Sequence, residues 1–161
     1  MKVSVVIPVF NESNTILKIL KKISKLKNIN KEIIIVDDGS TDNTKQIIKK
    51  KCKGLYTKFI TYKKNRGKGF ACRKGLKNVT GKIIIIQDAD LEYDPKDYKK
   101  LLKPILLNKT KIVYGSRVLE GGTRIRPKSI DVIVRLAANH FLTFFSNLLN
   151  NHNLTDAHTC Y

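Results

Sequence analysis

The stretch Ile83-Ile84-Ile85-Ile86-Gln87-Asp88-Ala89-Asp90 joins an unbroken apolar run to two carboxylates separated by one residue. A run of this length that consists almost wholly of Ile or Val is typical of a strand buried on both faces, as in a parallel sheet. Similar runs occur elsewhere in the chain: Val3 to Val9, Ile33 to Val36, Ile112 to Tyr114 and, more weakly, Lys58 to Tyr62. The sequence therefore predicts a mostly parallel sheet of short strands.

Helical patterns separate these runs. The first strand is followed by an apolar stripe at helical spacing, with Asn11 or Ser13 placed to cap it: Ile16, Leu17, Leu20, Ile23 and Leu26. Further helices are expected at four places: from about residue 40, near Gly67, after Asp94-Pro95, and from Ile130 to Leu149. Strands that alternate with helices indicate an α/β protein with helices on both faces of its sheet. We expect a single domain over residues 1–161.

Composition narrows the class of protein. A chain of 161 residues, 42% hydrophobic and 28% charged, is long enough for one globular core. The formal charge of +19 comes mostly from lysines dispersed along the chain, and no recognition motif accompanies them, so we expect no nucleic-acid partner. The apolar runs are far shorter than the roughly 18 residues of a membrane-spanning helix, and we expect no signal peptide. The three cysteines are widely separated, which favours free thiols in a reducing compartment.

Acidic and polar side chains follow three of the expected strands. Asp88 and Asp90 are spaced to hold one hard divalent cation, which could bridge the phosphates of a nucleotide diphosphate. Asp37 and Asp38 either belong only to a tight strand-to-helix turn, in which Ser40 or Thr41 caps the next helix, or accept hydrogen bonds from a base or a ribose. Residues 8–12 follow the first strand in the same way. Because parallel sheets bind ligands at the carboxyl ends of their strands, we expect these groups to form one site.

Five motifs, in this order and spacing, carry a resemblance to a known family. They are Ile7-Pro8-Val9-Phe10-Asn11-Glu12, Val36-Asp37-Asp38-Gly39-Ser40, Gly67-Lys68-Gly69, Asp88-Ala89-Asp90 and Gly115-Ser116-Arg117. Over essentially the whole chain this set resembles glycosyltransferase family 2, and it is most similar to the branch that makes polyprenyl-phosphate sugars, the dolichol-phosphate mannose and glucose synthases and their bacterial relatives. The resemblance implies a GT-A fold, a nucleotide-diphosphate sugar donor, Mg²⁺ or Mn²⁺ as cofactor, and inversion at the anomeric carbon.

The resemblance also implies roles for individual residues. Those that would surround the donor nucleotide are Pro8, Phe10, Glu12, Val36, Asp38 and Ala89. Asp88 and Asp90 would hold the metal, with Asp90 also catalytic, and Arg117 would bind the diphosphate, since a guanidinium can bond two oxygens at once. Lys68 is either a second phosphate ligand or a solvated surface lysine. Asp156 would act as a catalytic base or orient the acceptor.

The acceptor is left open between two classes. A lipid phosphate is already anionic and needs only cationic guidance and an apolar groove, which Arg124, Arg126 and the Phe-bearing helix after them offer. A hydroxyl acceptor must lose a proton and would need a base such as Asp156. That helix either packs in the core or contacts an anionic membrane, and the basic surface favours the membrane.

The resemblance therefore predicts transfer of a hexose to a polyprenyl phosphate at the cytoplasmic face of a membrane. The alternatives are a soluble or cell-surface glycan acceptor, or a nucleotide-sugar binding domain without transfer activity. Residues 1–117 would bind the donor and the metal, and residues 118–161 would form the acceptor loop and helix. Family members usually continue beyond this last segment, so the chain is expected to be C-terminally short, as a fragment or a natural truncation.

Overall fold

The computed structural model describes residues 1–116, 130–151 and 153–156. The chain divides into two compact units, residues 1–98 and 99–161, and each is described by itself. The first unit holds a four-stranded sheet, whereas the elements of the second are helical.

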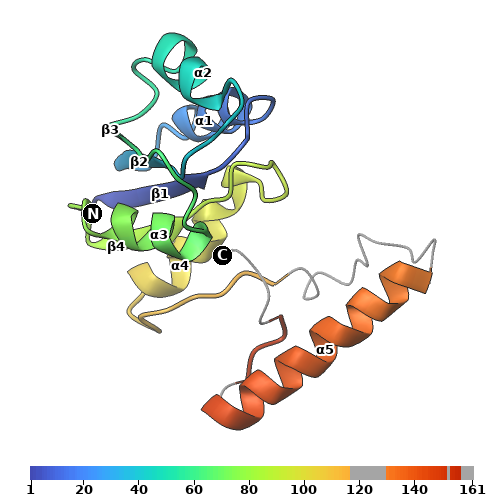
Figure 1. Ribbon diagram of the computed structural model, residues 1–161. Helices are drawn as coiled ribbons and strands as arrows, with labels where there is room; N and C mark the ends of the chain where they lie inside the picture. The colour runs from blue at the N-terminus through green and yellow to red at the C-terminus, as the bar shows by residue number, and fades with distance from the viewer. Residues whose placement is uncertain (117–129, 152, 157–161) are drawn as a thin grey trace. The chain divides into compact units, whose positions relative to one another are not determined.

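Four parallel strands form the sheet of the first unit (Figure 1): β1 (Val3–Val9), β2 (Lys31–Asp37), β3 (Lys58–Thr61) and β4 (Ile83–Ile86). Their order is β3-β2-β1-β4. Val9 lies beside Asp37 and Val6 beside Ile86, so the carboxyl ends of β1, β2 and β4 share one edge of the sheet. The predicted parallel α/β architecture is confirmed, and the loops that follow these three strands are brought together.

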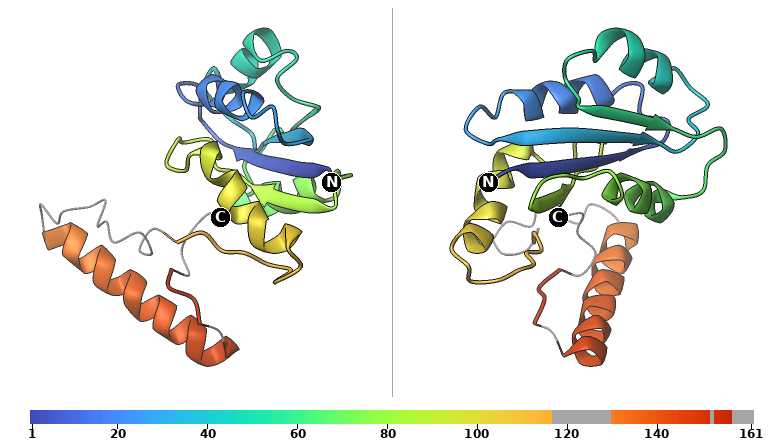
Figure 2. Two further views of the ribbon diagram at one scale, coloured as in Figure 1. Left: turned by 180° about the vertical axis from the view of Figure 1, so that it is seen from behind. Right: turned by 90° about the vertical axis from the view of Figure 1, so that its left-hand side faces the viewer.

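Two helices, α1 (Ile16–Ser24) and α2 (Thr44–Lys51), cover one face of the sheet (Figure 2). The apolar residues of α1 recur at helical spacing, which places them on one side of the helix. Four of them are fully buried, namely Ile16, Ile19, Leu20 and Ile23, and Leu17 is partly buried. Each side chain of this kind contributes roughly 1.5–3 kcal/mol when it is removed from water, and this burial holds α1 on the sheet.

Helix α3 (Lys68–Leu76) lies on the opposite face and approaches the sheet closely (Figure 2). A Cβ added at Gly75 would lie 2.3 Å from Val6 Cγ1, so only glycine permits this approach. One turn earlier, Ala71 packs in a cluster with Ile34 and Val36. This packing fixes the first turn of α3 beside the carboxyl edge of the sheet.

A short 3-10 turn, η1 (Pro95–Asp97), leads into α4 (Tyr98–Leu106). Asp94 caps η1 by accepting a hydrogen bond of 3.1 Å from the Lys96 backbone N–H, and Pro95 is its first residue, so the helical segment expected after Asp94-Pro95 is present. The second unit contains the long helix α5 (Ile130–Asn150), whose predicted span is confirmed to within one residue. None of the described helices is both long enough and apolar enough to cross a lipid bilayer.

Three sequence predictions about these elements are wrong. Residues 112–114 form no strand, and Ile112 is 67% exposed, because a short apolar run is stable as a strand only where a neighbour completes its hydrogen bonds. Strand β4 is not buried on both faces, since Ile84 is 43% exposed. Helix α1 is capped by neither Asn11 nor Ser13: it begins after Thr15, and the earlier residues bond to a neighbouring loop instead.

A buried carboxylate ties the strands together at the opposite edge of the sheet. Glu32, 4% exposed, accepts hydrogen bonds from Lys2 Nζ (2.7 Å), Thr80 N (2.6 Å) and Thr80 Oγ1 (2.8 Å), and also from the Ser4 hydroxyl. Burial raises the pKa of Glu32, but the hydrogen bonds from Lys2, Ser4 and Thr80 together outweigh it and hold the pKa far below its usual range. Glu32 therefore stays ionised and joins β1, β2 and the turn before β4.

Candidate functional site

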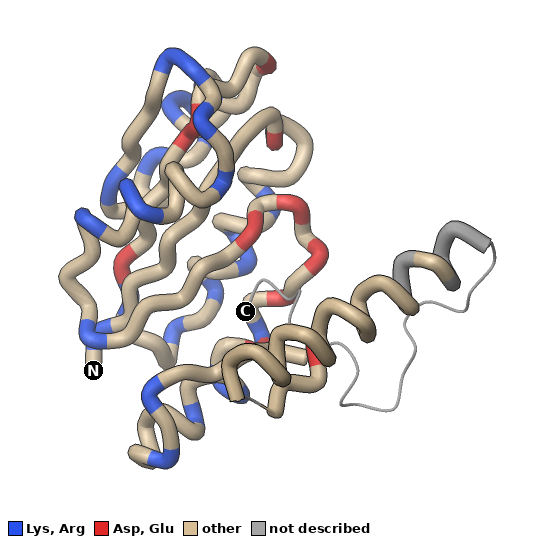
Figure 3. Tube along the Cα trace, turned by 60° about the horizontal axis from the view of Figure 1, so that its bottom comes forward, with Lys and Arg blue, Asp and Glu red and all other residues tan. Residues whose placement is uncertain are grey.

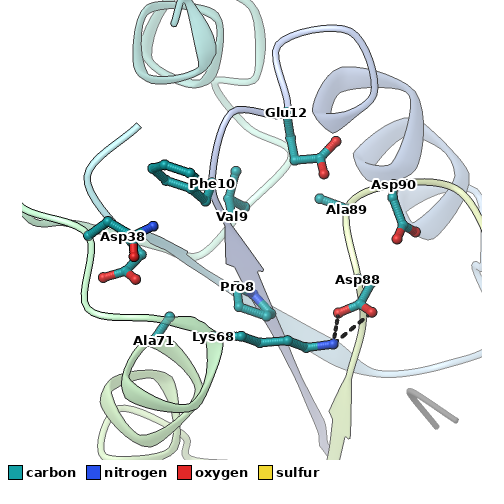
Figure 4. A pocket seen from close by; sticks show the side chains of 11 residues that line it. Pro8, Val9, Phe10, Glu12, Asp38, Lys68, Ala71, Asp88, Ala89 and Asp90 are labelled. Carbon is teal, nitrogen blue, oxygen red and sulfur yellow. Dashed lines mark hydrogen bonds and ion pairs between the residues drawn. The ribbon is translucent and has the colours of Figure 1, made fainter. Parts of the chain in front are cut away.

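A pocket of about 340 Å³ opens at the carboxyl edge of the sheet (Figure 4). Its walls come from the end of β1 and the loop after it, from the loops after β2 and β4, and from the start of α3 with the segment before it. They consist of Pro8, Val9, Phe10, Glu12, Asp38, Asn65, Lys68, Ala71, Asp88, Ala89 and Asp90. Eight of these were singled out in the sequence as candidate site residues. The structure thus brings together groups from four separate segments of the chain.

The two adjacent carboxylates after β2 have different roles. Asp37 is fully buried and serves the fold, because it accepts hydrogen bonds from Ser40 N (3.2 Å) and Thr61 Oγ1 (2.8 Å). Asp38 lines the pocket, and its Oδ2 accepts a hydrogen bond of 2.9 Å from Arg66 N. Its Oδ1 is buried and has no hydrogen-bond partner among the described residues. A buried carboxylate oxygen without a partner is costly, so this atom is suited to accept an N–H from a ligand.

A tight turn at Gly39 holds Asp38 in place. Gly39 has φ +78°, and a Cβ there would lie 2.7 Å from the backbone nitrogen of Asn65. Glycine is therefore required both for the left-handed conformation and for the close approach of the segment that contains Arg66. The Gly39 turn and the hydrogen bond from Arg66 together aim the carboxylate of Asp38.

The loop after β1 is bound to the loop after β2 by several hydrogen bonds. Asn11, with φ +57°, accepts a bond of 2.9 Å from Thr41 N through its Oδ1 and donates its own N–H to Ser40 Oγ at 2.9 Å. The next backbone N–H, from Glu12, donates to Thr44 Oγ1 at 2.8 Å. The sequence marked Asn11 as a helix cap; its actual contribution is to join two walls of the pocket.

Gln87 positions the loop after β4, a role that the sequence analysis did not assign. This fully buried side chain accepts a hydrogen bond of 2.9 Å from Tyr98 Oη and donates to the backbone oxygens of Asp88 (3.0 Å) and Tyr93 (3.3 Å). The sequence feature that could have indicated this role is a polar residue at the end of an otherwise apolar strand. By bridging both ends of the loop, Gln87 fixes the backbone that carries Asp88 and Asp90.

The two carboxylates of this loop already have partners. Lys68 Nζ lies 2.7 Å from Asp88 Oδ1 and 2.8 Å from Oδ2 (Figure 4). Asp90 Oδ1 accepts a hydrogen bond of 3.0 Å from Glu92 N. Lys68 is therefore not an isolated surface lysine, since it neutralises a carboxylate inside the pocket.

Other residues singled out in the sequence lie elsewhere. Val36 is fully buried against α3 and does not line the pocket. Asp156 is buried and belongs to the second unit. Arg117, Arg124 and Arg126 lie outside the described residues.

The positively charged residues are dispersed along the chain. Lysine and arginine positions are spread over many elements of the chain rather than gathered in one patch (Figure 3).

Within the described residues, no group of three or more His, Cys, Asp or Glu side chains is arranged to hold a metal ion. The carboxylate oxygens of Asp88 and Asp90 are nevertheless of the kind that Mg²⁺ and Mn²⁺ prefer. Both line one pocket, so their chemistry fits a cation that completes its coordination with ligand oxygens.

A sequence profile of "Glycosyl transferase family 2" matches residues 4–161. The chain belongs to this family. Among curated relatives, it is 35% identical to a dolichol-phosphate mannosyltransferase from Pyrococcus furiosus over 76% of this chain and 35% of that protein. It is 43% identical to a dolichyl-phosphate beta-glucosyltransferase from Saccharomyces cerevisiae over 63% of this chain and 34% of that protein. The chain thus spans about a third of the length of these two relatives.

Solved structures of other glycosyltransferases share the architecture, and the fold is GT-A. One is a mannosyltransferase from Pyrobaculum calidifontis in complex with GDP-Man and Mn²⁺ (TM-score 0.53, 28% identity, 59% of this chain and 29% of that one). Another is the glucosyl-3-phosphoglycerate synthase from Mycobacterium tuberculosis in complex with Mn²⁺, UDP and glucosyl-3-phosphoglycerate (TM-score 0.54, 28% identity, 65% of this chain and 39% of that one).

Proposed function

We propose that this chain binds a nucleotide-diphosphate sugar and transfers the hexose, with inversion, to a polyprenyl phosphate. The observation that carries the proposal is the buried Oδ1 of Asp38, which has no hydrogen-bond partner in the described part of the chain and belongs to the same pocket as Asp88 and Asp90. One side of the pocket thus offers an acceptor for a nucleobase N–H, and the other offers carboxylates for a cation bound to a diphosphate. This pairing suits a nucleotide-diphosphate ligand.

Each wall then has its own part in binding. Asp38 accepts the N–H of the base, while Pro8 and the ring of Phe10, 44% exposed, contact the nucleoside. Asp88 and Asp90 would hold Mg²⁺ or Mn²⁺, which when bound would stabilise the negative charge of a departing nucleoside diphosphate. Arg117, which lies outside the described residues, would bind the diphosphate oxygens. The family membership and the Mn²⁺ in two related structures support this assignment.

The acceptor is proposed from the named relatives and from the second unit. Two relatives are named for dolichol phosphate or dolichyl phosphate. Helix α5 carries several exposed apolar side chains that suit a lipid chain or a membrane surface: Phe141, Leu142, Phe144, Phe145, Leu148 and Leu149. A lipid phosphate is anionic, so Arg124 and Arg126 would dock it. Because it needs no deprotonation, Asp156 would orient the acceptor rather than act as a base. This activity would take place at the cytoplasmic face of a membrane.

Donor binding is tested first, by titrating the chain with UDP-glucose and GDP-mannose in Mg²⁺ and then in EDTA. We expect metal-dependent binding of one donor. Asp38→Asn should weaken it roughly tenfold or more, because a hydrogen bond to a charged group is lost and an N–H now faces the base. Glu92→Gln, an exposed carboxylate next to the site, is the matched control and should bind normally. Absence of binding to both donors would refute the proposal.

Transfer is tested next, with a radiolabelled donor and either polyprenyl phosphate or a soluble glycan. Labelled lipid supports the proposed acceptor, whereas labelled glycan alone contradicts it. Donor binding without either product would show a nucleotide-sugar binding domain that lacks transfer activity.

A further inference from the structure

The ion pair between Lys68 and Asp88 uses the oxygens that a cation would need. One ammonium faces both carboxylate oxygens, at 2.7 and 2.8 Å. The side chain of Asp88 is only 14% exposed and that of Lys68 is 52% exposed, so the carboxylate lies deeper than the ammonium. A divalent cation can bind Asp88 only by displacing this ammonium or by sharing the carboxylate with it.

The position of Lys68 allows such a displacement. Lys68 is the first residue of α3 and follows Gly67, so it lies at the end of the helix where backbone N–H groups favour anions. Its four-carbon side chain is flexible and half exposed, and it projects across the pocket from α3 toward Asp88 (Figure 4). An ammonium released from Asp88 therefore remains on the pocket wall, within reach of a diphosphate bound there.

We propose that Lys68 is an internal counterion that competes with the divalent cation for Asp88 and passes to the donor's phosphates when the cation binds. The inference rests on the proposed function, because it assumes that a nucleotide diphosphate enters this pocket. The cation alone must break the ion pair without compensation, whereas the cation together with a diphosphate gives Lys68 new partners. The two ligands then bind cooperatively, and by linkage each strengthens the other equally.

The first experiment measures Mn²⁺ binding to the whole chain without nucleotide, from the electron paramagnetic resonance signal of free Mn²⁺. Lys68→Met should bind Mn²⁺ roughly fivefold more tightly than the wild type, the size expected for removing a competing, partly exposed ion pair. Lys68→Arg keeps the positive charge and should bind nearly as the wild type does. Lys77→Met removes an exposed lysine at the far end of α3 and should change nothing. Asp88→Asn should weaken binding in both backgrounds, which would locate the measured cation at this carboxylate.

Unchanged or weaker Mn²⁺ binding by Lys68→Met, with normal circular dichroism, would overturn the competition and leave the ion pair as a surface contact without effect on the site. An effect of equal size in Lys77→Met would also overturn it, since the change would then reflect net charge alone.

The second experiment compares Mn²⁺ affinity with and without UDP or GDP. The ratio of the two Mn²⁺ affinities should fall several-fold in Lys68→Met, because this variant has no ammonium that can bind the diphosphate. An unchanged ratio would overturn the transfer of Lys68 to the phosphates. If the wild type binds neither nucleotide, the proposed function fails, while the measurement without nucleotide still decides whether Lys68 competes with the cation.

Discussion

Replacing Glu32 with Gln tests whether the buried carboxylate at the far edge of the sheet stabilises the fold through its charge. The substitution keeps the shape of the side chain but removes the negative charge that Lys2, Ser4 and Thr80 bond. Glu32 is 4% exposed, whereas the Lys2 side chain is 40% exposed, so the ion pair is screened and contributes at the level of a surface pair, about 1 kcal/mol. Weakening the buried bonds from Ser4 and Thr80 adds about 2 kcal/mol.

We therefore expect Glu32→Gln to lower the free energy of unfolding by about 3 kcal/mol at pH 7, measured by urea denaturation with far-ultraviolet circular dichroism. The folded-state pKa of Glu32 lies below its ordinary value of 4.5. Its charge thus stabilises the fold above that value, and this stabilisation is lost as the pH falls further. The difference in the free energy of unfolding between the wild type and Glu32→Gln should shrink by about 1.4 kcal/mol per pH unit below 4.5.

Glu92→Gln, in which an exposed carboxylate is neutralised, should stay within about 0.5 kcal/mol of the wild type. The account of this network would be refuted if the free energies of unfolding of the wild type and Glu32→Gln differed by less than 1 kcal/mol at pH 7. It would also be refuted if their difference were the same at pH 7 and pH 3.5.

Two further predictions concern the backbone around the pocket. Gly39→Ala should destabilise the fold by about 2 kcal/mol or more and weaken donor binding, because the added Cβ clashes with Asn65 N and the positive φ is strained for alanine. Gly54 has φ +81° but open space around it, so Gly54→Ala should show only the backbone strain, about 1 kcal/mol. Equal losses in the two variants, compared by urea denaturation, would mean that the close approach at Gly39 is unimportant. Tyr98→Phe removes the hydrogen bond to Gln87 and should cost about 1 kcal/mol in the same assay, whereas Tyr114→Phe, at an exposed tyrosine, should be neutral. A neutral Tyr98→Phe would contradict the positioning role of Gln87.

The strands that build the site could be predicted because their signal is local. Runs of Ile and Val marked β1, β2 and β4, and parallel pairing brings their carboxyl ends to one edge. Residues 112–114 gave the same local signal but form no strand, since pairing depends on a neighbour that no short run specifies. The exposure of Ile84 has a similar cause: composition does not reveal whether an element covers the face of a strand.

The residues of the pocket were predictable as a set, but their individual roles were not. Asp37 and Asp38 are chemically identical, and only the pleat of β2 decides that one bonds within the fold while the other lines the pocket. The pairing of Lys68 with Asp88, separated by 20 residues, depends on how α3 packs against the sheet. Such contacts arise from tertiary structure and leave no pattern in the local sequence.

The hydrogen bonds that join Asn11 and Glu12 to the loop after β2 and to the start of α2 bear on the thermodynamics of ligand recognition. They order two walls of the pocket before any ligand arrives, so binding there requires little further loss of conformational entropy. The side of the pocket where we propose that the nucleoside binds is in this sense preorganised, whereas the proposed competition at Lys68 requires the other side to rearrange when a cation enters. Recognition of the base should accordingly resemble the docking of a rigid body, and the slower, metal-dependent adjustment should be confined to the phosphate end.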